Sequence, residues 1–294
     1  EAPAWDIGLA QGDITAWEPG MAMDGWGRFD HRVRGIAERL MVRAMVVRDR
    51  ADGGRVALAV LDLMAIPLLL RQAVVERLAT PRPERAWHPH DVMLLATHTH
   101  SAPSGLTDSP FYNSVNFGFA PDVFDHVAGV TADTILRAED GLRPGRIRPG
   151  RVRIPASEPV AFNRSLLAHR ANADVTGPLS AEDAVDREMI VLRIDDAAGV
   201  EVGAVSFLAS HGTTVHGDRP LLHPDHKGLA AERLARLRGG TLPDGSSYVA
   251  LFAQTCAGDV TPNHRPSVAR GFHVAAWDDD EESARRIAEI EARH

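Results

Sequence analysis

The sequence contains one cysteine, Cys256, among its 294 residues. A single thiol excludes an internal disulfide and any zinc site made only of cysteines. No apolar run reaches the ~20 residues that a membrane-spanning helix requires, so we expect no transmembrane segment. Basic residues are also in the minority, with 32 lysines and arginines against 40 aspartates and glutamates. Because nucleic-acid-binding surfaces are usually basic, we expect no nucleic-acid partner.

Histidine is the residue type that stands out against an otherwise ordinary composition. The chain is 44% hydrophobic and 24% charged, which is typical of a globular protein of one large domain or two. Of its 14 histidines, eight fall in two windows, 88–100 and 211–226. This clustering directs attention to chemistry at those two places.

The first window ends in a histidine pair that follows an apolar run. Residues 92–96 read as a buried strand, and His98 and His100 come directly after it. Residues i and i+2 of an extended chain point to the same side, so the two imidazoles can reach one point. Neutral imidazole is a common metal ligand, which suggests a metal site. The alternative is a pair of histidines that only form hydrogen bonds at a strand end.

Two more apolar strands end in polar, glycine-containing segments. Residues 202–209 lead to His211, and residues 248–253 lead to Asp259 and Thr261. Binding sites in open α/β sheets form at the carboxyl ends of strands. We therefore expect the three strands to be neighbours, with these side chains and the first histidine pair around one crevice.

The mixture of residues at these strand ends favours one kind of site. Several histidines with a carboxylate and without paired cysteines suit Zn²⁺, although other divalent metals also fit. Thr261 can supply a hydroxyl as a donor or nucleophile, or it can be only a turn hydroxyl beside Pro262.

The hydrophobic pattern predicts an α/β fold with a mixed β-sheet core flanked by helices and a metal site at the C-terminal ends of strands. Strand, helix and strand over 56–64, 67–78 and 91–96 favour a parallel pair with a helical crossover. The remaining expectations are an edge strand at 7–15, a strand at 39–47 with a hairpin turn at 52–54, a loop at 111–120, helices at 121–138, 229–237 and 281–292, a solvated connection at 143–153, and a hairpin of 189–194 with 202–209. The aromatic residues of the loop either pack locally or form the wall of an apolar pocket.

In their order along the chain, the motifs resemble the N-terminal catalytic domain of the neutral, non-lysosomal ceramidase family. The resemblance runs nearly end to end. It is carried by Gly12–Thr15, Met23–Trp26, Leu40–Ala44, the Thr-His-Thr-His-Ser signature within Ala96–Gly105, Phe162–Ser165, Ser206–Thr213, Pro224–Gly228 and Phe252–Asn263.

The resemblance implies roles for individual residues. His98 and His211 would be zinc ligands, and His100 would sit beside the metal to handle the carbonyl oxygen or a proton. Thr261 takes the position of a catalytically important serine. We therefore predict that Thr261 and His100 are the catalytic residues. Arg164 would line the pocket.

Asp259 completes the expected substrate-binding residues, together with Arg164. The sequence also departs from the family pattern, because Thr261 adds a methyl group to the serine position and His216, His223 and His226 are extra histidines. These three either tune the site or lie in a surface loop.

The implied activity is zinc-dependent cleavage of the N-acyl amide bond of ceramide to a sphingoid base and a fatty acid. Residues 1–294 would form the catalytic domain, incomplete at its C-terminal side, because the family's other zinc ligands, a glutamate and a tyrosine, come later. The expected partner is a lipid or N-acyl amide, with peripheral contact at a membrane surface. Two alternatives stay open: a metallohydrolase of another N-acyl amide or ester, and a non-catalytic relative that only binds lipid.

Overall fold

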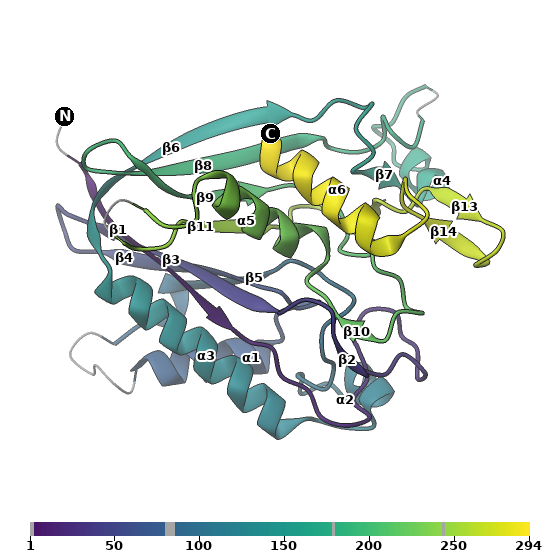
Figure 1. Ribbon diagram of the computed structural model, residues 1–294, viewed down its shortest axis with the longest axis horizontal. Coiled ribbons are helices and arrows are strands. Elements are labelled where there is room, and N and C mark those ends of the chain that lie inside the picture. Colours follow the sequence, from purple (N-terminus) through teal and green to yellow (C-terminus); the bar gives the residue numbers. More distant parts are fainter. Residues whose placement is uncertain (1–2, 80–85, 178–179, 243–244) are drawn as a thin grey trace.

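The protein is built on one eight-stranded mixed sheet, in the strand order β11-β9-β8-β6-β1-β3-β4-β5 (Figure 1). The computed structural model describes residues 3–79, 86–177, 180–242 and 245–294. The strands are β1 (Trp5–Asp13), β3 (Met41–Asp49), β4 (Arg55–Leu61), β5 (Val92–Ala96), β6 (Arg143–Arg153), β8 (Glu188–Asp196), β9 (Glu201–Phe207) and β11 (Val249–Ala253).

Among the described residues, four helices of 12 or more residues accompany the sheet: α1 (Leu68–Ala79), α3 (Pro121–Asp140), α5 (Asp225–Leu237) and α6 (Asp280–Arg293). Shorter elements are β2 (Gly35–Ile36), α2 (Pro110–Asn113), β7 (Phe162–Asn163), α4 (Leu166–Arg170), β10 (Leu221–Leu222), β12 (Val260–Thr261), β13 (Arg265–Ser267), β14 (Phe272–Val274) and two 3₁₀ turns at Pro89–Asp91 and Ser114–Asn116. The predicted α/β class with a mixed sheet flanked by helices is confirmed. In the part of the chain that the structure describes, no helix is long and apolar enough to span a bilayer.

Strand alternation explains how the sheet divides the core. On β3, Val42, Ala44 and Val46 belong to the cluster that includes buried residues of α1 and α3. Met45 and Val47 point to the opposite face and join the cluster that contains β9, β11 and α5. Successive side chains of a strand face opposite sides, so one apolar strand contributes to both layers. The predicted parallel pair is also confirmed, because β4 and β5 pair in parallel with α1 between them along the chain.

Two predictions about strands are wrong. Residues 143–153 form β6, which pairs with β8 over residues 145–153. Most of β6 is exposed and only residues 143–145 pair with β1, so Pro149 lies where the second edge of the strand is free, a position that tolerates proline. The strand predicted at the sheet edge, β1, instead lies between β3 and β6.

The three strands that lead to the site are not all neighbours in the sheet, which corrects another expectation. β9 and β11 are adjacent, but β5 lies at the opposite edge. Their ends still meet, because the sheet curls until β11 packs over β3 and β4. A parallel bridge joins Thr99 to Gly212, and the Gln254 side chain donates a hydrogen bond of 2.9 Å to the Thr97 carbonyl. The fold thus brings both edges together at one point.

Candidate metal centre and cavity

Three histidines converge where the two edges of the sheet meet. The ligand nitrogens of His98, His100 and His211 all lie within 4.8 Å of one another. The Nε2 atoms of His98 and His211 are 2.8 Å apart, and those of His98 and His100 are 3.4 Å apart. Residues separated by 113 positions in the sequence therefore face one point, at the C-terminal ends of β5 and β9. This histidine cluster is the candidate for the metal site predicted at the strand ends. The ligand roles of His98 and His211 stay predictions.

Backbone carbonyls orient two of these rings. The Nδ1 atom of His98 lies 2.6 Å from the Met64 carbonyl oxygen, and that of His211 lies 2.7 Å from the Ala257 carbonyl oxygen. A carbonyl only accepts, so each Nδ1 carries the proton and each Nε2 presents a lone pair to the other. Two lone pairs at 2.8 Å repel, and a cation between them removes that repulsion. The residues present therefore fit a metal ion.

Burial keeps these imidazoles in the neutral form that binds metals. It lowers the pKa of His98 and lowers that of His100 well below its usual range. For His211, burial together with the nearby His98 and Arg164 lowers the pKa to about 4. All three rings are consequently neutral near pH 7, so no proton has to leave before a metal binds.

A glycine in the loop before β2 makes room for His100. Gly25 has a φ of +99°, and a Cβ atom on it would lie 2.4 Å from Cγ of His100. The next residue, Trp26, meets the His100 ring edge-on at 5.2 Å between centroids. Gly25 and Trp26 of this loop therefore pack directly onto the third histidine.

Gly212 marks the closest approach between the two histidine-bearing segments. A Cβ atom at this position would lie 2.5 Å from the His98 carbonyl oxygen and 2.8 Å from Thr99 Cα. The His100 amide also donates to the Gly212 carbonyl, at 3.0 Å. Only a residue without a side chain fits here, since both neighbours are backbone atoms.

We expect Gly212→Ala to lower the free energy of unfolding by about 2–3 kcal/mol, because the new methyl group must push two backbone segments apart. Urea denaturation of the metal-free protein measures this. The matched control is Gly129→Ala in α3, where a Cβ atom meets nothing within 4 Å, and a gain of about 0.5–1 kcal/mol is expected. An equal free energy of unfolding for Gly212→Ala and the wild type would contradict the prediction, because it would show that the two histidine-bearing segments can move apart without loss of stability.

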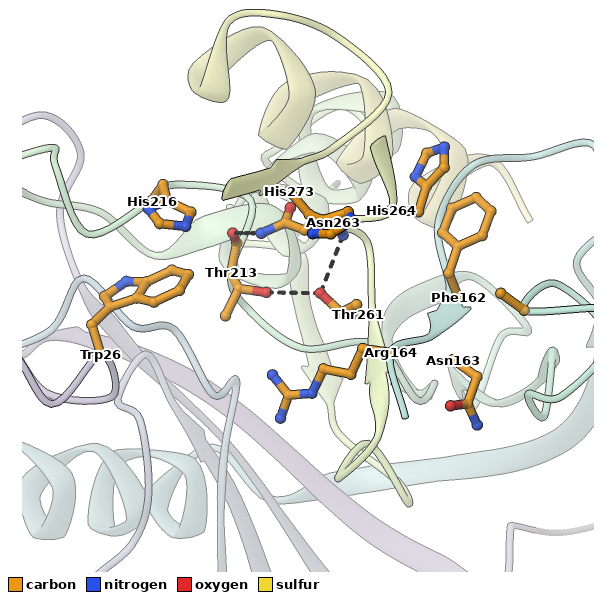
Figure 2. Close-up of a pocket in the computed structure, with 11 residues that line it drawn as sticks. Trp26, Phe162, Asn163, Arg164, Thr213, His216, Thr261, Asn263, His264 and His273 are labelled. Atoms are coloured by element: carbon orange, nitrogen blue, oxygen red, sulfur yellow. Dashed lines mark hydrogen bonds between the residues drawn. The ribbon is translucent and has the colours of Figure 1, made fainter. Parts of the chain in front are cut away.

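A cavity of about 370 Å³ opens beside the histidines and contains the Thr261 hydroxyl (Figure 2). The Thr261 Oγ1 atom accepts a hydrogen bond from the Asn263 amide at 3.1 Å and lies 3.3 Å from Thr213 Oγ1. The Asn263 side chain in turn donates to the Thr213 carbonyl at 2.6 Å. The lining residues are Trp26, Phe162, Asn163, Arg164, Ala181, Thr213, His216, Thr261, Asn263, His264 and His273.

The two predicted substrate-binding residues have different surroundings. Arg164 lines the cavity, donates to the Gly258 carbonyl at 2.9 Å and places its guanidinium 3.2 Å from His211 Nε2. Asp259 is half-buried, is not among the lining residues and accepts from the Asn163 side chain at 2.8 Å. The substrate-binding role of each stays a prediction, and the surroundings of Arg164 suit it better.

The aromatic residues of 111–120 do not line this cavity. Phe111, Tyr112, Phe117 and Phe119 are all exposed, on and after the short helix α2. Phe117 stacks on Phe29 of the loop before β2. Phe111 also contacts Tyr112, and Phe119 contacts the buried Phe124. The rings therefore pack locally at the surface, as the first alternative predicted, and none of them is a wall of this cavity.

The extra histidines are buried, so the surface-loop alternative for them is wrong. The exposed fractions of His216, His223 and His226 are 9%, 3% and 0%. His216 lies on the cavity wall and stacks on Phe272 at 3.4 Å between centroids. Burial lowers the pKa of His216 to about 4.

The pKa of His216 predicts a pH dependence of stability. Between the unfolded value of 6.5 and the folded value of about 4, the unfolded chain binds more protons, so stability falls as the pH falls through this window. At 1.36 kcal/mol per pKa unit, the loss approaches roughly 3 kcal/mol. We expect His216→Phe to remove it while keeping an aromatic ring in the stack. Urea denaturation of both metal-free proteins at pH 7, 6 and 5 measures the difference, and equal pH slopes would contradict the prediction.

Several residues that shape the site lie in motifs named from the sequence but were given no individual role there. They are Thr213 and Gly212, which follow His211, Gln254, which joins the two edges, and Trp26 against His100. Gly212 and Thr213 belong to the polar turn after an apolar strand, and this pattern does predict that they lie near the site. Their roles depend on contacts with segments more than 40 residues away, which no local pattern records.

Comparison with known proteins finds relatives that match over most of the chain. Residues 5–274 match the family model for the N-terminal part of neutral/alkaline non-lysosomal ceramidases. The neutral ceramidase of Pseudomonas aeruginosa is 34% identical over 257 residues, which cover 87% of this chain and 37% of that protein. The neutral ceramidase of Mycobacterium tuberculosis is 30% identical over 265 residues, 87% of this chain and 40% of that protein.

Solved structures give the same result. The crystal structure of the Pseudomonas aeruginosa neutral ceramidase superimposes with a TM-score of 0.88 at 31% identity, covering 100% of this chain and 44% of that chain. A structure described as a ceramidase complexed with C2 gives 0.87 at 32% identity, covering 100% and 43%. The chain thus spans about two fifths of the length of these relatives. It belongs to the neutral/alkaline non-lysosomal ceramidase family and corresponds to the N-terminal part of its members.

Proposed function

We propose that this protein is a zinc-dependent amidohydrolase that cleaves the N-acyl amide bond of ceramide to a sphingoid base and a fatty acid. One observation carries the proposal. In a chain of the ceramidase family, three neutral imidazoles converge beside a cavity that holds a threonine hydroxyl and a guanidinium. Residues 1–294 would act as the ceramidase-type catalytic domain.

His98 and His211 are the residues that would hold the metal, because carbonyls fix both rings with Nε2 facing the cluster. Zinc bound there would polarise a carbonyl oxygen and lower the pKa of water. Histidine nitrogens without cysteine ligands are suited to a catalytic rather than a structural zinc site.

His100 is the candidate for proton transfer. Its ring is buried and neutral, and its Nδ1 atom has no hydrogen-bond partner in the described part of the chain. A neutral imidazole can accept a proton at one stage and return it to a leaving amine at another. Trp26 and Gly25 hold the ring in place while it does so.

Thr261 is better placed to donate a hydrogen bond than to attack. Its Oγ1 atom already accepts from the Asn263 amide, so its own proton is available to Thr213 or to a substrate oxygen. A nucleophilic hydroxyl needs an adjacent base, and the partners of Thr261 in the described residues are a hydroxyl and an amide. Arg164, at the same cavity, supplies a fixed positive charge for a developing negative one.

A lipid substrate also accounts for the exposed aromatic side chains. Phe29 and Phe117, which stack on each other, are 56% and 79% exposed, and Phe111 is 78% exposed. Clusters of large exposed apolar side chains are typical of interaction surfaces. We include in the proposal that the protein makes peripheral contact with a lipid surface.

Turnover of a substrate panel tests the proposal against its alternatives. The purified protein, loaded with zinc, is incubated with ceramide, other N-acylated amines and fatty esters, and the products are measured by mass spectrometry. Release of sphingoid base and fatty acid from ceramide supports the proposal. Turnover of other amides or esters alone would favour a different metallohydrolase. Lipid binding without turnover, together with no stoichiometric zinc, would favour the non-catalytic relative.

A further inference from the structure

One short segment, residues 223–227 at the start of α5, connects the two histidine-bearing segments to each other. On one side it binds the segment after β5. The Thr99 hydroxyl donates to the His223 carbonyl at 2.7 Å, and the His223 amide donates to the Ser101 carbonyl at 3.0 Å. Thr99 stands between His98 and His100, so this pair of hydrogen bonds fixes the backbone that carries both rings.

On its other side, the same segment binds the backbone that follows β9. The Asp225 carboxylate accepts from the Val215 amide at 2.9 Å and from the Thr214 hydroxyl. His226 Nε2 lies 3.0 Å from the His211 carbonyl oxygen and donates to it. Residues 223–227 therefore hold the His98–His100 segment and the His211 segment by direct hydrogen bonds.

The conformation of Asp225 shows how tightly this segment is constrained. Asp225 has a φ of +55°, which is unusual for a residue other than glycine. Its amide donates to His223 Nδ1 at 2.9 Å, and its carboxylate also accepts from the His226 amide at 2.7 Å. Such a backbone persists only where the surroundings determine it, and these positions are frequent near functional sites.

A buried contact with α6 fixes the other face of His226. Its Nδ1 atom lies 3.0 Å from Glu291 Oε1, and the Lys227 ammonium lies 3.7 Å from the same oxygen. The side chains of His226 and Glu291 are 0% exposed. The imidazole thus donates a hydrogen bond from Nε2 to the backbone of a candidate metal ligand and lies at ion-pair distance from a carboxylate of α6 on its other side.

We propose that Asp225 and His226 are positioning residues that set the spacing between the His98–His100 pair and His211, and that metal affinity depends on them although neither lies in the cluster of candidate ligands. This inference rests on the proposed function, since it concerns the metal centre proposed there. Residues that orient metal ligands from outside typically change metal affinity 10–100-fold when they are replaced.

The test is the zinc affinity of Asp225→Asn, measured by competition with a chromophoric chelator. The variant keeps the side-chain volume, but its amide nitrogen replaces one acceptor oxygen, so the Val215 amide or the Thr214 hydroxyl loses its partner. We expect the zinc Kd to rise 10–100-fold and the visible spectrum of the Co²⁺-substituted protein to change. The control is Glu232→Gln, an α5 carboxylate that pairs with Arg236 on the surface, for which the Kd should stay within twofold of the wild-type value.

A second variant keeps the test decisive if Asp225→Asn does not fold. Thr99→Val preserves the shape of the side chain and removes the hydroxyl, which donates to the His223 carbonyl and accepts from the Ser101 amide at 3.2 Å. We expect a 3–10-fold higher zinc Kd. NMR of the imidazole nitrogens in the metal-free proteins adds a readout without metal, because displaced rings change the resonances of His98 and His211. Wild-type Kd values and unchanged imidazole resonances in the variants would overturn the inference.

These outcomes are distinct from a failure of the proposed function. A wild-type protein that binds zinc but does not cleave ceramide would contradict the proposed substrate and leave the positioning inference standing. A wild-type protein that binds no zinc would contradict the proposed metal centre, and the imidazole resonances would still show whether residues 223–227 set the spacing.

Discussion

Replacing His98 or His211 by alanine is expected to abolish amide hydrolysis and to reduce bound zinc from about one equivalent per chain to a small fraction of that value. Each ring contributes one Nε2 atom to a pair only 2.8 Å apart, so removing either leaves a site with a single oriented ligand. Zinc content is measured by atomic absorption after dialysis, and hydrolysis by release of the sphingoid base.

A histidine outside the cluster provides the control for both variants. His90 is exposed and lies beside Asp91 at the surface, at the start of the same histidine-rich window. His90→Ala should keep full zinc content and full activity. Zinc content that stays unchanged in both His98→Ala and His211→Ala would refute the ligand assignment, whatever happens to the rate.

For Thr261→Ala, we expect kcat to fall by about 10²–10³-fold, the usual effect of removing one donor that stabilises charge in the transition state. Zinc content should not change, since the contacts of Thr261 are with Thr213 and Asn263 rather than with the histidines. The effect on kcat should therefore exceed the effect on metal affinity, and steady-state kinetics with parallel metal analysis measures both.

Thr261→Ser is the matched comparison for this prediction. Serine keeps the hydroxyl and removes only the methyl group, so activity should stay within about threefold of the wild-type value if the hydroxyl is what matters. Wild-type activity in Thr261→Ala would mean that this side chain has a structural role, through its contact with the Asn263 amide.

Patterns that depend on neighbouring residues predicted much of the fold. The alternation of apolar side chains over 39–47 identified β3, and α1 between two apolar runs indicated the parallel pair of β4 and β5. The i, i+2 spacing of His98 and His100 likewise placed both rings on one side. These rules work because strand and helix geometry fixes where nearby side chains point.

The predictions that failed depend on contacts between distant parts of the chain. β6 has prolines and exposed arginines, and it is a strand because β8 supplies its hydrogen-bond partners. His223 and His226 are buried because α5 and α6 close over them, which their polar surroundings in the sequence do not suggest. The ends of β5, β9 and β11 meet because the sheet curls, so strands that meet at the site need not be neighbours in the sheet.

The individual roles at the candidate site came from resemblance rather than from pattern. Strand ends and histidine spacing selected His98, His100, His211, Asp259 and Thr261, but only similarity to a family separated ligands from catalytic groups. The structure supplies the physical basis for part of that division, because backbone carbonyls orient His98 and His211, whereas the Nδ1 of His100 has no partner in the described residues.

The curled sheet has a thermodynamic consequence. The segment after β5, at one edge of the sheet, meets the segment after β9, the strand next to the other edge, and the candidate ligands His98, His100 and His211 lie on the two sides of this contact. A metal ion bound to residues of both segments would link them, so its binding free energy would add to the free energy that stabilises their contact. Loss of the ion and fraying of the two sheet edges would then be linked equilibria. A chelator that removes the ion would therefore lower the stability of the fold as well as abolish the metal-dependent activity.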